Sequence, residues 1–196
     1  YAKIEYYDNG KLKTEFYYKE GKPAGLNRAK YYDKYGRIKT DQNYTGGMKD
    51  GLTREYYENG KVKTEEKYAG DQREGLRREY SAGGTLILEQ NYRKGILEGV
   101  TRSYYGIDRL ESEKTYANGK KEGHAKIYYD SGKLKAEQFY KDDKLDGKCR
   151  EYYENGKLKF EYTYKDGKQN EPTRLVAGNG RLQVDLEFSE GNLAGI

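Results

Sequence analysis

Short runs of alternating apolar and polar residues repeat along the whole chain. In each run an aliphatic residue is followed six positions later by an aromatic one, with mostly polar residues between them. The pairs are Leu12 and Tyr18, Ile38 and Tyr44, Val62 and Tyr68, Leu86 and Tyr92, Leu110 and Tyr116, Leu134 and Tyr140, Leu158 and Tyr164, and Leu182 and Phe188. Runs of this length with a period of two are typical of half-buried β-strands.

Turn-forming residues precede these runs at a regular interval. They are Gly10, Gly36, Gly60, Gly84, Asp108, Gly132, Gly156 and Gly180, with a spacing of 26 residues once and 24 thereafter. Eight copies therefore cover the chain. Asn-Gly at 9–10, 59–60, 155–156 and 179–180 predicts two-residue type I′ hairpin turns, because both central residues of that turn need φ above zero. A second glycine seven residues after most of the aromatics predicts a second, longer turn.

Folding the third copy about 59–60 sets a strand register. It places Glu58 opposite Lys61, Tyr57 opposite Val62, Arg54 opposite Glu65 and Gly51 opposite Tyr68. The same register gives further opposite-charge pairs in later copies: Arg78 with Glu89, Arg102 with Glu113, Lys126 with Glu137, Arg150 with Glu161, and Arg174 with Asp185. The longer second copy fits if it has a four-residue loop at 33–36, which predicts these pairs: Tyr31 with Ile38, Arg28 with Asp41, and Gly25 with Tyr44.

Side chains alternate across a strand, so this register separates two faces. Tyr57, Val62 and Tyr68 are expected on one face, where the second aromatic lies over a glycine, and this face is predicted to be the better buried. The other face is expected to carry a ladder of ion pairs such as Arg54 with Glu65, together with the neighbouring residues Tyr56 and Lys63.

The fold class expected from this pattern is all-β: an elongated single-layer antiparallel β-meander of about eight tandem 24-residue hairpin repeats, one array spanning 1–196. Only 34% of the residues are hydrophobic and 36% are charged, which excludes a thick core. The 24 tyrosines between turn glycines favour a thin folded sheet over a disordered chain. Apolar residues distinguish the last copy, which is interpreted as a terminal cap or as a strand that meets another surface: Val176, Val184, Leu186 and Phe188.

Charge and candidate chemistry narrow the function. The net charge of +5 comes from basic and acidic residues interleaved throughout, so no nucleic-acid groove is expected. His124 is the only histidine and is expected to be an exposed strand residue, while Cys149, the only cysteine, is expected to be a small packed thiol. The carboxylates of the ladder are already paired. No catalytic residue, metal site or cofactor is predicted.

No apolar run is long enough for a membrane-spanning helix. Because the sequence starts at Tyr1 rather than at Met, an export signal that has been removed is compatible with it. A secreted or cell-surface location is favoured over a cytoplasmic one.

The recurring sequence Tyr-Tyr-x-Asn-Gly-Lys-Leu-Lys, followed by Tyr-Lys-Asp-Gly-Lys, resembles the bacterial variant of the MORN repeat (membrane occupation and recognition nexus) along essentially the full chain. The resemblance implies stacked hairpins in an extended sheet and a role in protein interaction, with lipid contact often proposed for the wider family. Members similar to this chain are commonly labelled toxin-antitoxin system antitoxins, and others are exported to the cell surface.

The candidate binding face is the ladder face, because tyrosine beside arginine is enriched at binding hot spots. Its candidate residues are Tyr56, Tyr80, Tyr104, Tyr128, Tyr152, Arg54, Arg78, Arg102 and Arg150. An alternative interpretation is that these rings only cover the stems of Lys63, Lys135 and Lys159. The predicted function is a non-catalytic scaffold for protein–protein interaction, in the form of an antitoxin, immunity or cell-surface protein, and the alternative is a peripheral binder of anionic lipid or another polyanion.

Overall fold

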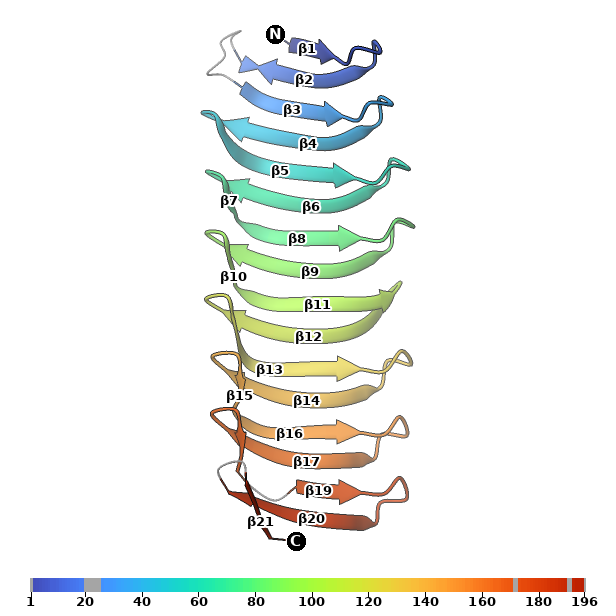
Figure 1. Ribbon diagram of the computed structural model, residues 1–196, viewed down its shortest axis with the longest axis vertical. Coiled ribbons are helices and arrows are strands. Elements are labelled where there is room, and N and C mark those ends of the chain that lie inside the picture. Colours follow the sequence, from blue (N-terminus) through green and yellow to red (C-terminus); the bar gives the residue numbers. More distant parts are fainter. Residues whose placement is uncertain (1, 20–25, 171–172, 190–191, 196) are drawn as a thin grey trace. The chain divides into compact units, whose positions relative to one another are not determined.

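The computed structural model describes residues 2–19, 26–170, 173–189 and 192–195 (Figure 1). Short turns join the strands wherever the connection lies within the described residues, and neighbouring strands of the sheet pair in antiparallel fashion. Contacts divide the chain into two compact units, residues 1–96 and 97–196. The predicted all-β meander of hairpins is confirmed.

The first unit contains the strands of the first four copies. β7 is a short arm between β6 and β8. The strands are β1 (Ala2–Tyr6), β2 (Leu12–Tyr18), β3 (Leu26–Tyr32), β4 (Ile38–Thr45), β5 (Met48–Tyr56), β6 (Val62–Ala69), β7 (Gln72–Arg73), β8 (Gly75–Tyr80) and β9 (Leu86–Arg93). A further short arm, β10 (Ile96–Leu97), spans the boundary of the two units.

The second unit repeats the same arrangement, with the short arms β15 and β18 in the positions that β7 takes in the first. Its strands are β11 (Gly99–Gly106), β12 (Arg109–Ala117), β13 (Lys120–Tyr128), β14 (Leu134–Lys141), β15 (Lys144–Leu145), β16 (Gly147–Tyr152), β17 (Leu158–Lys165), β18 (Lys168–Gln169), β19 (Thr173–Val176), β20 (Leu182–Ser189) and β21 (Asn192–Gly195).

The Asn-Gly turns differ from the predicted type I′ geometry. In the third copy the Gly60 N–H donates to the Tyr57 carbonyl over 2.9 Å, and the Tyr57 N–H donates to the Lys61 carbonyl over 2.8 Å. Within the loop only Gly60 has a positive φ, of 81°. This is a three-residue loop, a type I turn followed by a left-handed glycine. The same bonds recur with Gly10, Gly36, Gly84, Gly132, Gly156 and Gly180.

Asparagine is placed in this turn by its side-chain hydrogen bonds and not by a positive φ. The Asn59 Oδ1 accepts a hydrogen bond from the Lys61 N–H at 3.0 Å, and its Nδ2 donates to the Ala82 carbonyl of the next copy at 2.9 Å. Both ends of the side-chain amide are therefore used, one within the turn and one between copies. Asn9 and Asn155 make the same pair of contacts.

The extra loop residue changes the register beside the turn. Arg54 lies opposite Glu65 and Gly51 opposite Tyr68, as predicted, but a bulge between Glu55 and Tyr56 places Tyr56 opposite Val62. The predicted pairs of Tyr57 with Val62 and of Glu58 with Lys61 are wrong. Val62 consequently lies on the same face as Arg54, and not with Tyr68.

The second copy also differs from its predicted register. Its tight loop is also three residues long, 34–36. Tyr32, not Tyr31, lies opposite Ile38. Lys30 lies opposite Asp41, and Arg28 reaches Asp41 diagonally at 2.5 Å. The predicted pairing of Gly25 with Tyr44 lies outside the described residues.

The two additional residues of the long first interval lie between β2 and β3. Thr14 pairs with Tyr31, seventeen positions on, whereas Thr40 pairs with Glu55, fifteen positions on. The predicted insertion in the loop at 33–36 is therefore wrong.

The second turn of each copy is the one with type I′ geometry. Ala69 pairs with Gln72, and the two residues between them, Gly70 and Asp71, have φ of 55° and 66°. Equivalent turns occur at 46–47, 94–95, 118–119, 142–143 and 166–167. The prediction that the second turn is the longer one is wrong.

The buried face contains small side chains flanked by tyrosines. Ala29, Thr53, Ala125 and Cys149 occupy one equivalent position in four of the copies and are buried, whereas Arg77 and Thr101 at the same position of the two intervening copies are half-buried. Beside this position, the aromatic series lies opposite glycine as predicted: Gly51 with Tyr68, Gly75 with Tyr92, Gly99 with Tyr116, Gly123 with Tyr140, and Gly147 with Tyr164. Tyrosine rings over bare backbone thus replace a thick core.

The last copy carries apolar residues at several of these positions. Val184 and Leu186 occupy the positions that Thr64 and Glu66 take in the third copy, and both are partly exposed. The side chain of Phe188 is not among those that the structure describes. A capping role for this copy stays a prediction.

Asn59→Gly tests the role of the turn asparagine. Because φ at position 59 is negative, glycine removes two hydrogen bonds and adds chain entropy, which predicts a loss of about 1–2 kcal/mol in the free energy of unfolding. Urea denaturation measures it. An unchanged or raised stability would instead indicate a left-handed residue 59, as in a type I′ turn.

A comparison of Gly147→Ala with Gly132→Ala separates the cost of backbone strain at positive φ from the cost of a close side-chain contact. Both glycines have positive φ, 122° and 81°, so alanine costs about 1–2 kcal/mol at each. At Gly147 the new Cβ would also lie 3.2 Å from the Phe139 Cβ, whereas at Gly132 it meets open space. The Gly147 variant is expected to unfold at lower urea, and equal midpoints would show that the close contact has no cost.

Candidate functional site

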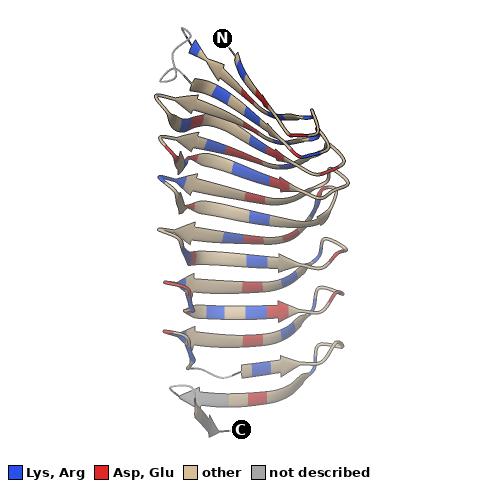
Figure 2. Cartoon of the chain, turned by 45° about the horizontal axis from the view of Figure 1, so that its top comes forward, with Lys and Arg blue, Asp and Glu red and all other residues tan. Residues whose placement is uncertain are grey.

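The predicted ladder of ion pairs is present on the face that carries Arg54, here called the ladder face. Neighbouring strands bring basic and acidic residues to the same level (Figure 2). The contacts are Arg54–Glu65 at 2.7 Å, Arg78–Glu89 at 3.0 Å, Arg102–Glu113 at 2.8 Å, Arg150–Glu161 at 2.8 Å and Arg174–Asp185 at 3.6 Å. Lys126 lies opposite Glu137 in the same register.

The candidate tyrosines lie next to this ladder, each opposite the aliphatic residue of its own hairpin. The pairs are Tyr56 with Val62, Tyr80 with Leu86, Tyr104 with Leu110, Tyr128 with Leu134, and Tyr152 with Leu158. Within each of the two units, the structure therefore brings the candidate tyrosines and arginines together on one face of the sheet. Whether they bind a partner stays a prediction.

Hydroxyl groups of this series bond to the ladder of the preceding copy. Tyr80 donates to Glu65 at 3.1 Å, and Tyr152 donates to Glu137 at 3.1 Å. Burial, together with the hydrogen bond to Glu65, raises the pKa of Tyr80. The hydrogen bond from Arg54 lowers the pKa of Glu65. The rings are thus held in place by charged acceptors and stay neutral around neutral pH.

A hollow recurs at one place in the repeat, between the aliphatic residue of one copy and the tyrosine of the next. Val62 and Tyr80 line a hollow of about 400 Å³ together with Lys61 and Glu65. The other two have the same position in the repeat: Ile38 and Tyr56 line one of about 260 Å³, and Leu110 and Tyr128 line one of about 470 Å³. Three of the five candidate tyrosines therefore form part of a hollow.

The ammonium groups of Lys63, Lys135 and Lys159 lie over tyrosines outside the candidate series. The lysines in question lie over the preceding tyrosine of the loop: Lys63 over Tyr57 at 5.9 Å, Lys135 over Tyr129 at 5.6 Å, and Lys159 over Tyr153 at 5.6 Å. These loop tyrosines also connect copies, since the Tyr57 hydroxyl donates to the Tyr80 carbonyl at 2.8 Å. Whether Tyr56, Tyr128 and Tyr152 cover the aliphatic stems of these lysines stays a prediction.

Sequence reasoning missed the role of the acidic residue before each second glycine. Glu74 accepts a hydrogen bond from the Lys94 N–H at 2.8 Å, in the I′ turn of the next copy. Glu98, Glu122 and Asp146 do the same for Asn118, Asp142 and Asp166. The sequence signal for this role is an acidic residue directly before a glycine, repeated every 24 residues. These acidic residues therefore have a structural role in the turns.

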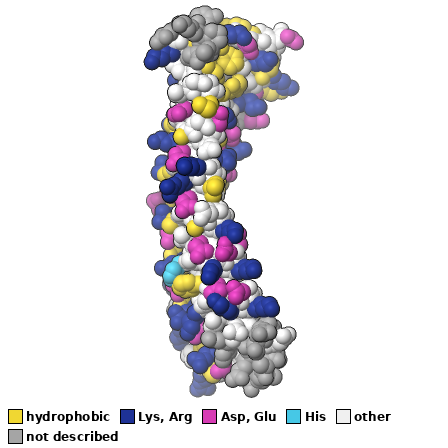
Figure 3. Space-filling model, turned by 90° about the vertical axis from the view of Figure 1, so that its left-hand side faces the viewer, with side chains coloured by type: hydrophobic (Ala, Val, Ile, Leu, Met, Phe, Trp, Pro, Cys, Tyr) yellow, Lys and Arg dark blue, Asp and Glu magenta, His cyan; other side chains and the backbone are white. Residues whose placement is uncertain are grey.

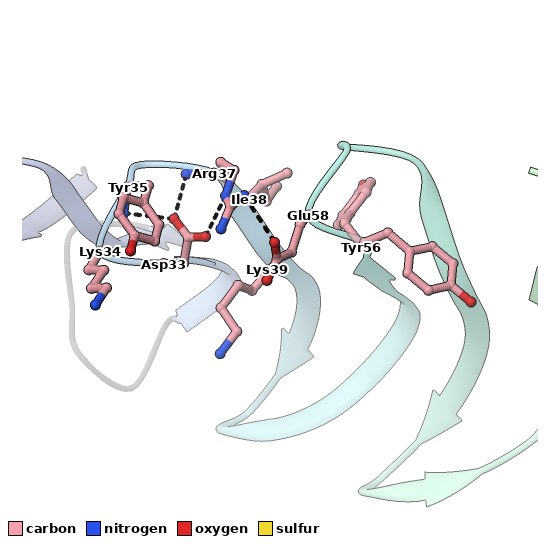
Figure 4. Close-up of a pocket in the computed structure, with 9 residues that line it drawn as sticks. Asp33, Lys34, Tyr35, Arg37, Ile38, Lys39, Tyr56 and Glu58 are labelled. Atoms are coloured by element: carbon pink, nitrogen blue, oxygen red, sulfur yellow. Dashed lines mark hydrogen bonds and ion pairs between the residues drawn. The ribbon is translucent and has the colours of Figure 1, made fainter. Parts of the chain in front are cut away.

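Tyr35 was also missed. Its side chain is 63% exposed at the tight turn of the second copy. Figure 4 shows it beside Lys34 and Arg37 at the edge of the hollow of Ile38 and Tyr56. Its signal in the sequence is the aromatic residue at the position where Asn9, Asn59 and Asn155 stand in other copies.

The lone histidine and cysteine lie as predicted. His124 is exposed on a strand, with its ring centroid 3.9 Å from that of Phe139. Cys149 is buried, and burial raises the pKa of its thiol, which disfavours the reactive thiolate.

Neither a metal-ligand cluster nor a membrane-spanning helix occurs among the described residues. His, Cys, Asp and Glu side chains there form no group of three or more that could hold a metal ion. In the same part of the chain no helix is long and apolar enough to cross a membrane. On the side of the molecule in Figure 3, basic and acidic side chains are interspersed.

The fold and its recurring hollows define a tandem β-hairpin repeat protein. A family model described as the MORN repeat variant matches residues 3–23, 49–69, 73–94, 121–142 and 145–166, more than half of the chain. The chain belongs to this family, whose repeats form non-enzymatic scaffolds. A comparison with curated proteins finds no match.

A double-mutant cycle of Arg54→Ala and Glu65→Ala tests the ladder. Because the Arg54 side chain is 42% exposed, a coupling of about 0.2–1 kcal/mol is expected at pH 7. The folded-state pKa of Glu65 is lowered, so this stability is present above the usual carboxyl pKa and is lost as pH falls through the lowered value. Urea unfolding across that pH range measures it. A coupling that persists in strong acid would contradict the charge account.

Proposed function

We propose that this protein is a non-catalytic scaffold that binds another protein through the ladder face. The observation that carries the proposal is the recurrence of one hollow at equivalent positions, between Ile38 and Tyr56, Val62 and Tyr80, and Leu110 and Tyr128. A repeated hollow on a repeated sheet suits an extended partner that contacts several copies.

The chemistry of the hollows supports protein recognition. Each combines an aliphatic side chain with a tyrosine ring. In the two hollows of the first unit, an arginine of the ladder stands two residues before the tyrosine: Arg54 before Tyr56 and Arg78 before Tyr80. Aromatic and arginine side chains carry much of the binding energy of protein interfaces. Tyr80 is held in place by Glu65, so little side-chain entropy is lost when a partner covers it.

The biological form of the scaffold is part of the same proposal. An antitoxin, immunity or cell-surface role, and a secreted location, follow from the resemblance of the repeats to bacterial MORN variants. A fold alone does not specify a partner, so these roles rest on analogy.

A second candidate is peripheral binding to anionic lipid. Lysines flank the aliphatic residue at several tight turns, as in Lys11–Lys13, Lys61–Lys63, Lys133–Lys135 and Lys157–Lys159. Such clusters attract an anionic surface in a salt-dependent manner. Flotation with phosphatidylserine vesicles at low and high salt tests this candidate, and no association at low salt would rule it out.

Affinity capture from lysate and envelope fractions of the source cell tests the protein-binding proposal. The ladder variant carries Tyr56→Ser, Tyr80→Ser and Tyr128→Ser, and the matched control carries Met48→Ser and Ile96→Ser, which are exposed residues away from these three hollows. We expect a protein that the native chain and the control retain and that the ladder variant loses. Urea unfolding of each variant confirms folding. Equal retention by all three would contradict the proposal.

A further inference from the structure

The tight turn of the second copy differs from its equivalents. Where the third copy has Glu58 and Asn59 before its glycine, the second has Lys34 and Tyr35. The change replaces an acid by a base and a bridging amide by an aromatic ring. Tyr35 is 63% exposed, so its ring is presented to solvent.

A network of hydrogen bonds fixes this loop. Asp33 Oδ1 accepts from the backbone N–H groups of Tyr35 at 2.9 Å and of Arg37 at 3.0 Å. Asp33 Oδ2 accepts from Arg37 Nε at 2.6 Å, and Arg37 also reaches Glu58 of the next copy at 3.2 Å (Figure 4). The loop backbone that carries Tyr35 is therefore fixed before a partner binds, which lowers the entropy lost on binding.

The two cations beside Tyr35 lie against its ring. Lys34 Nζ is 5.2 Å and Arg37 Cζ 5.0 Å from the ring centroid. These distances are within cation–π range, so the ring and both cations form one cluster. An exposed aromatic ring combined with arginine is the composition of an interface hot spot.

The hollow beside this cluster has the size for a side chain. Ile38, Tyr56 and Tyr57 supply its apolar lining, and its volume is about 260 Å³. Small-molecule pockets usually measure about 300–1,000 Å³, so the hollow is below that range. An aliphatic or aromatic anchor from a polypeptide fits this geometry better than a cofactor.

The rim of the hollow is positively charged. Lys34 and Lys39 line it, and the Lys11 side chain lies near Gly36, which stands between the lining residues Tyr35 and Arg37 in the chain. Asp33 and Glu58, the acidic residues of the lining, both pair with Arg37. Within the described part of the chain, Lys11, Lys34 and Lys39 have no ion pair and are exposed. The complementary ligand is anionic.

We propose that this cluster of Lys34, Tyr35, Arg37, Lys39 and the hollow of Ile38 and Tyr56 binds an acidic amphipathic segment of a partner protein. An apolar side chain of the segment enters the hollow, and its carboxylates face the three lysines. The inference deepens the proposed function and rests on it, because it names the chemistry of the partner at one hollow.

The repeat supplies its own test variant. Lys34→Glu with Tyr35→Asn gives the second loop the two residues of the third, Glu58 and Asn59, so the variant is expected to fold. Lys157→Glu at the tight turn of the seventh copy is the matched control, because it changes the net charge by the same amount as Lys34→Glu. Both variants are compared with the native chain by urea unfolding before any binding measurement.

The probe is a fluorescein-labelled synthetic peptide of about twelve residues, long enough for about three helical turns, in which Glu residues are interspersed with Leu and Phe. Its counterpart has Lys in place of every Glu. Fluorescence anisotropy measures binding at low and at raised salt. We expect the acidic peptide to bind the native chain and the Lys157→Glu variant, and to bind the double variant at least about tenfold more weakly.

Three results would overturn the inference. They are equal binding of the acidic peptide to the native chain and the double variant, equal binding of the acidic and basic peptides, and phosphatidylserine vesicles that bind with the same dependence on Lys34 and Tyr35. If the acidic peptide fails while the ladder tyrosines are still needed for capture from lysate, the inference fails and the scaffold stands. If capture is also independent of those tyrosines, the proposed function fails as well.

Discussion

The structure depends on hydrogen bonds that pass from each copy of the repeat to the next. At the tight turn, the Asn59 amide donates to the Ala82 carbonyl and the Tyr57 hydroxyl donates to the Tyr80 carbonyl. At the opposite end of the hairpin, the Asp71 N–H donates to the Lys49 carbonyl. A single hairpin of this kind has no core that could stabilise it alone, so pairing and these contacts between copies supply what a thick core supplies elsewhere.

The same stacking creates the candidate site. Each hollow takes its aliphatic side from one copy and its tyrosine from the next, as Val62 and Tyr80 do. A hairpin in isolation would have neither the hollow nor the Glu65 carboxylate that holds the tyrosine hydroxyl. The proposed binding site at the ladder face is thus a property of neighbouring copies, and local variation such as Tyr35 changes one hollow without altering the repeat.

The sequence predicted the strands, the glycine positions and the central register. Charge complementarity identified Arg54 with Glu65, and folding the copy about the Asn-Gly turn at 59–60 identified Gly51 with Tyr68. The turn types could not be derived, because an asparagine that bonds through its side chain looks the same in a sequence as one with a positive φ. The register predicted for the second copy was wrong for a related reason. Arg28 is long enough to reach Asp41 diagonally, so its ion pair with Asp41 is compatible with two registers. Hollows formed between copies have no local signature at all.

Tyrosine labelling with tetranitromethane, read by mass spectrometry with and without a captured partner, tests the central claim most directly. Binding through the ladder face predicts that the partner protects Tyr56, Tyr80 and Tyr128, while Tyr68, Tyr92 and Tyr140 on the buried face react equally in both states. Protection of Tyr68, Tyr92 and Tyr140 on the buried face, with unchanged labelling of the ladder tyrosines, would contradict the account.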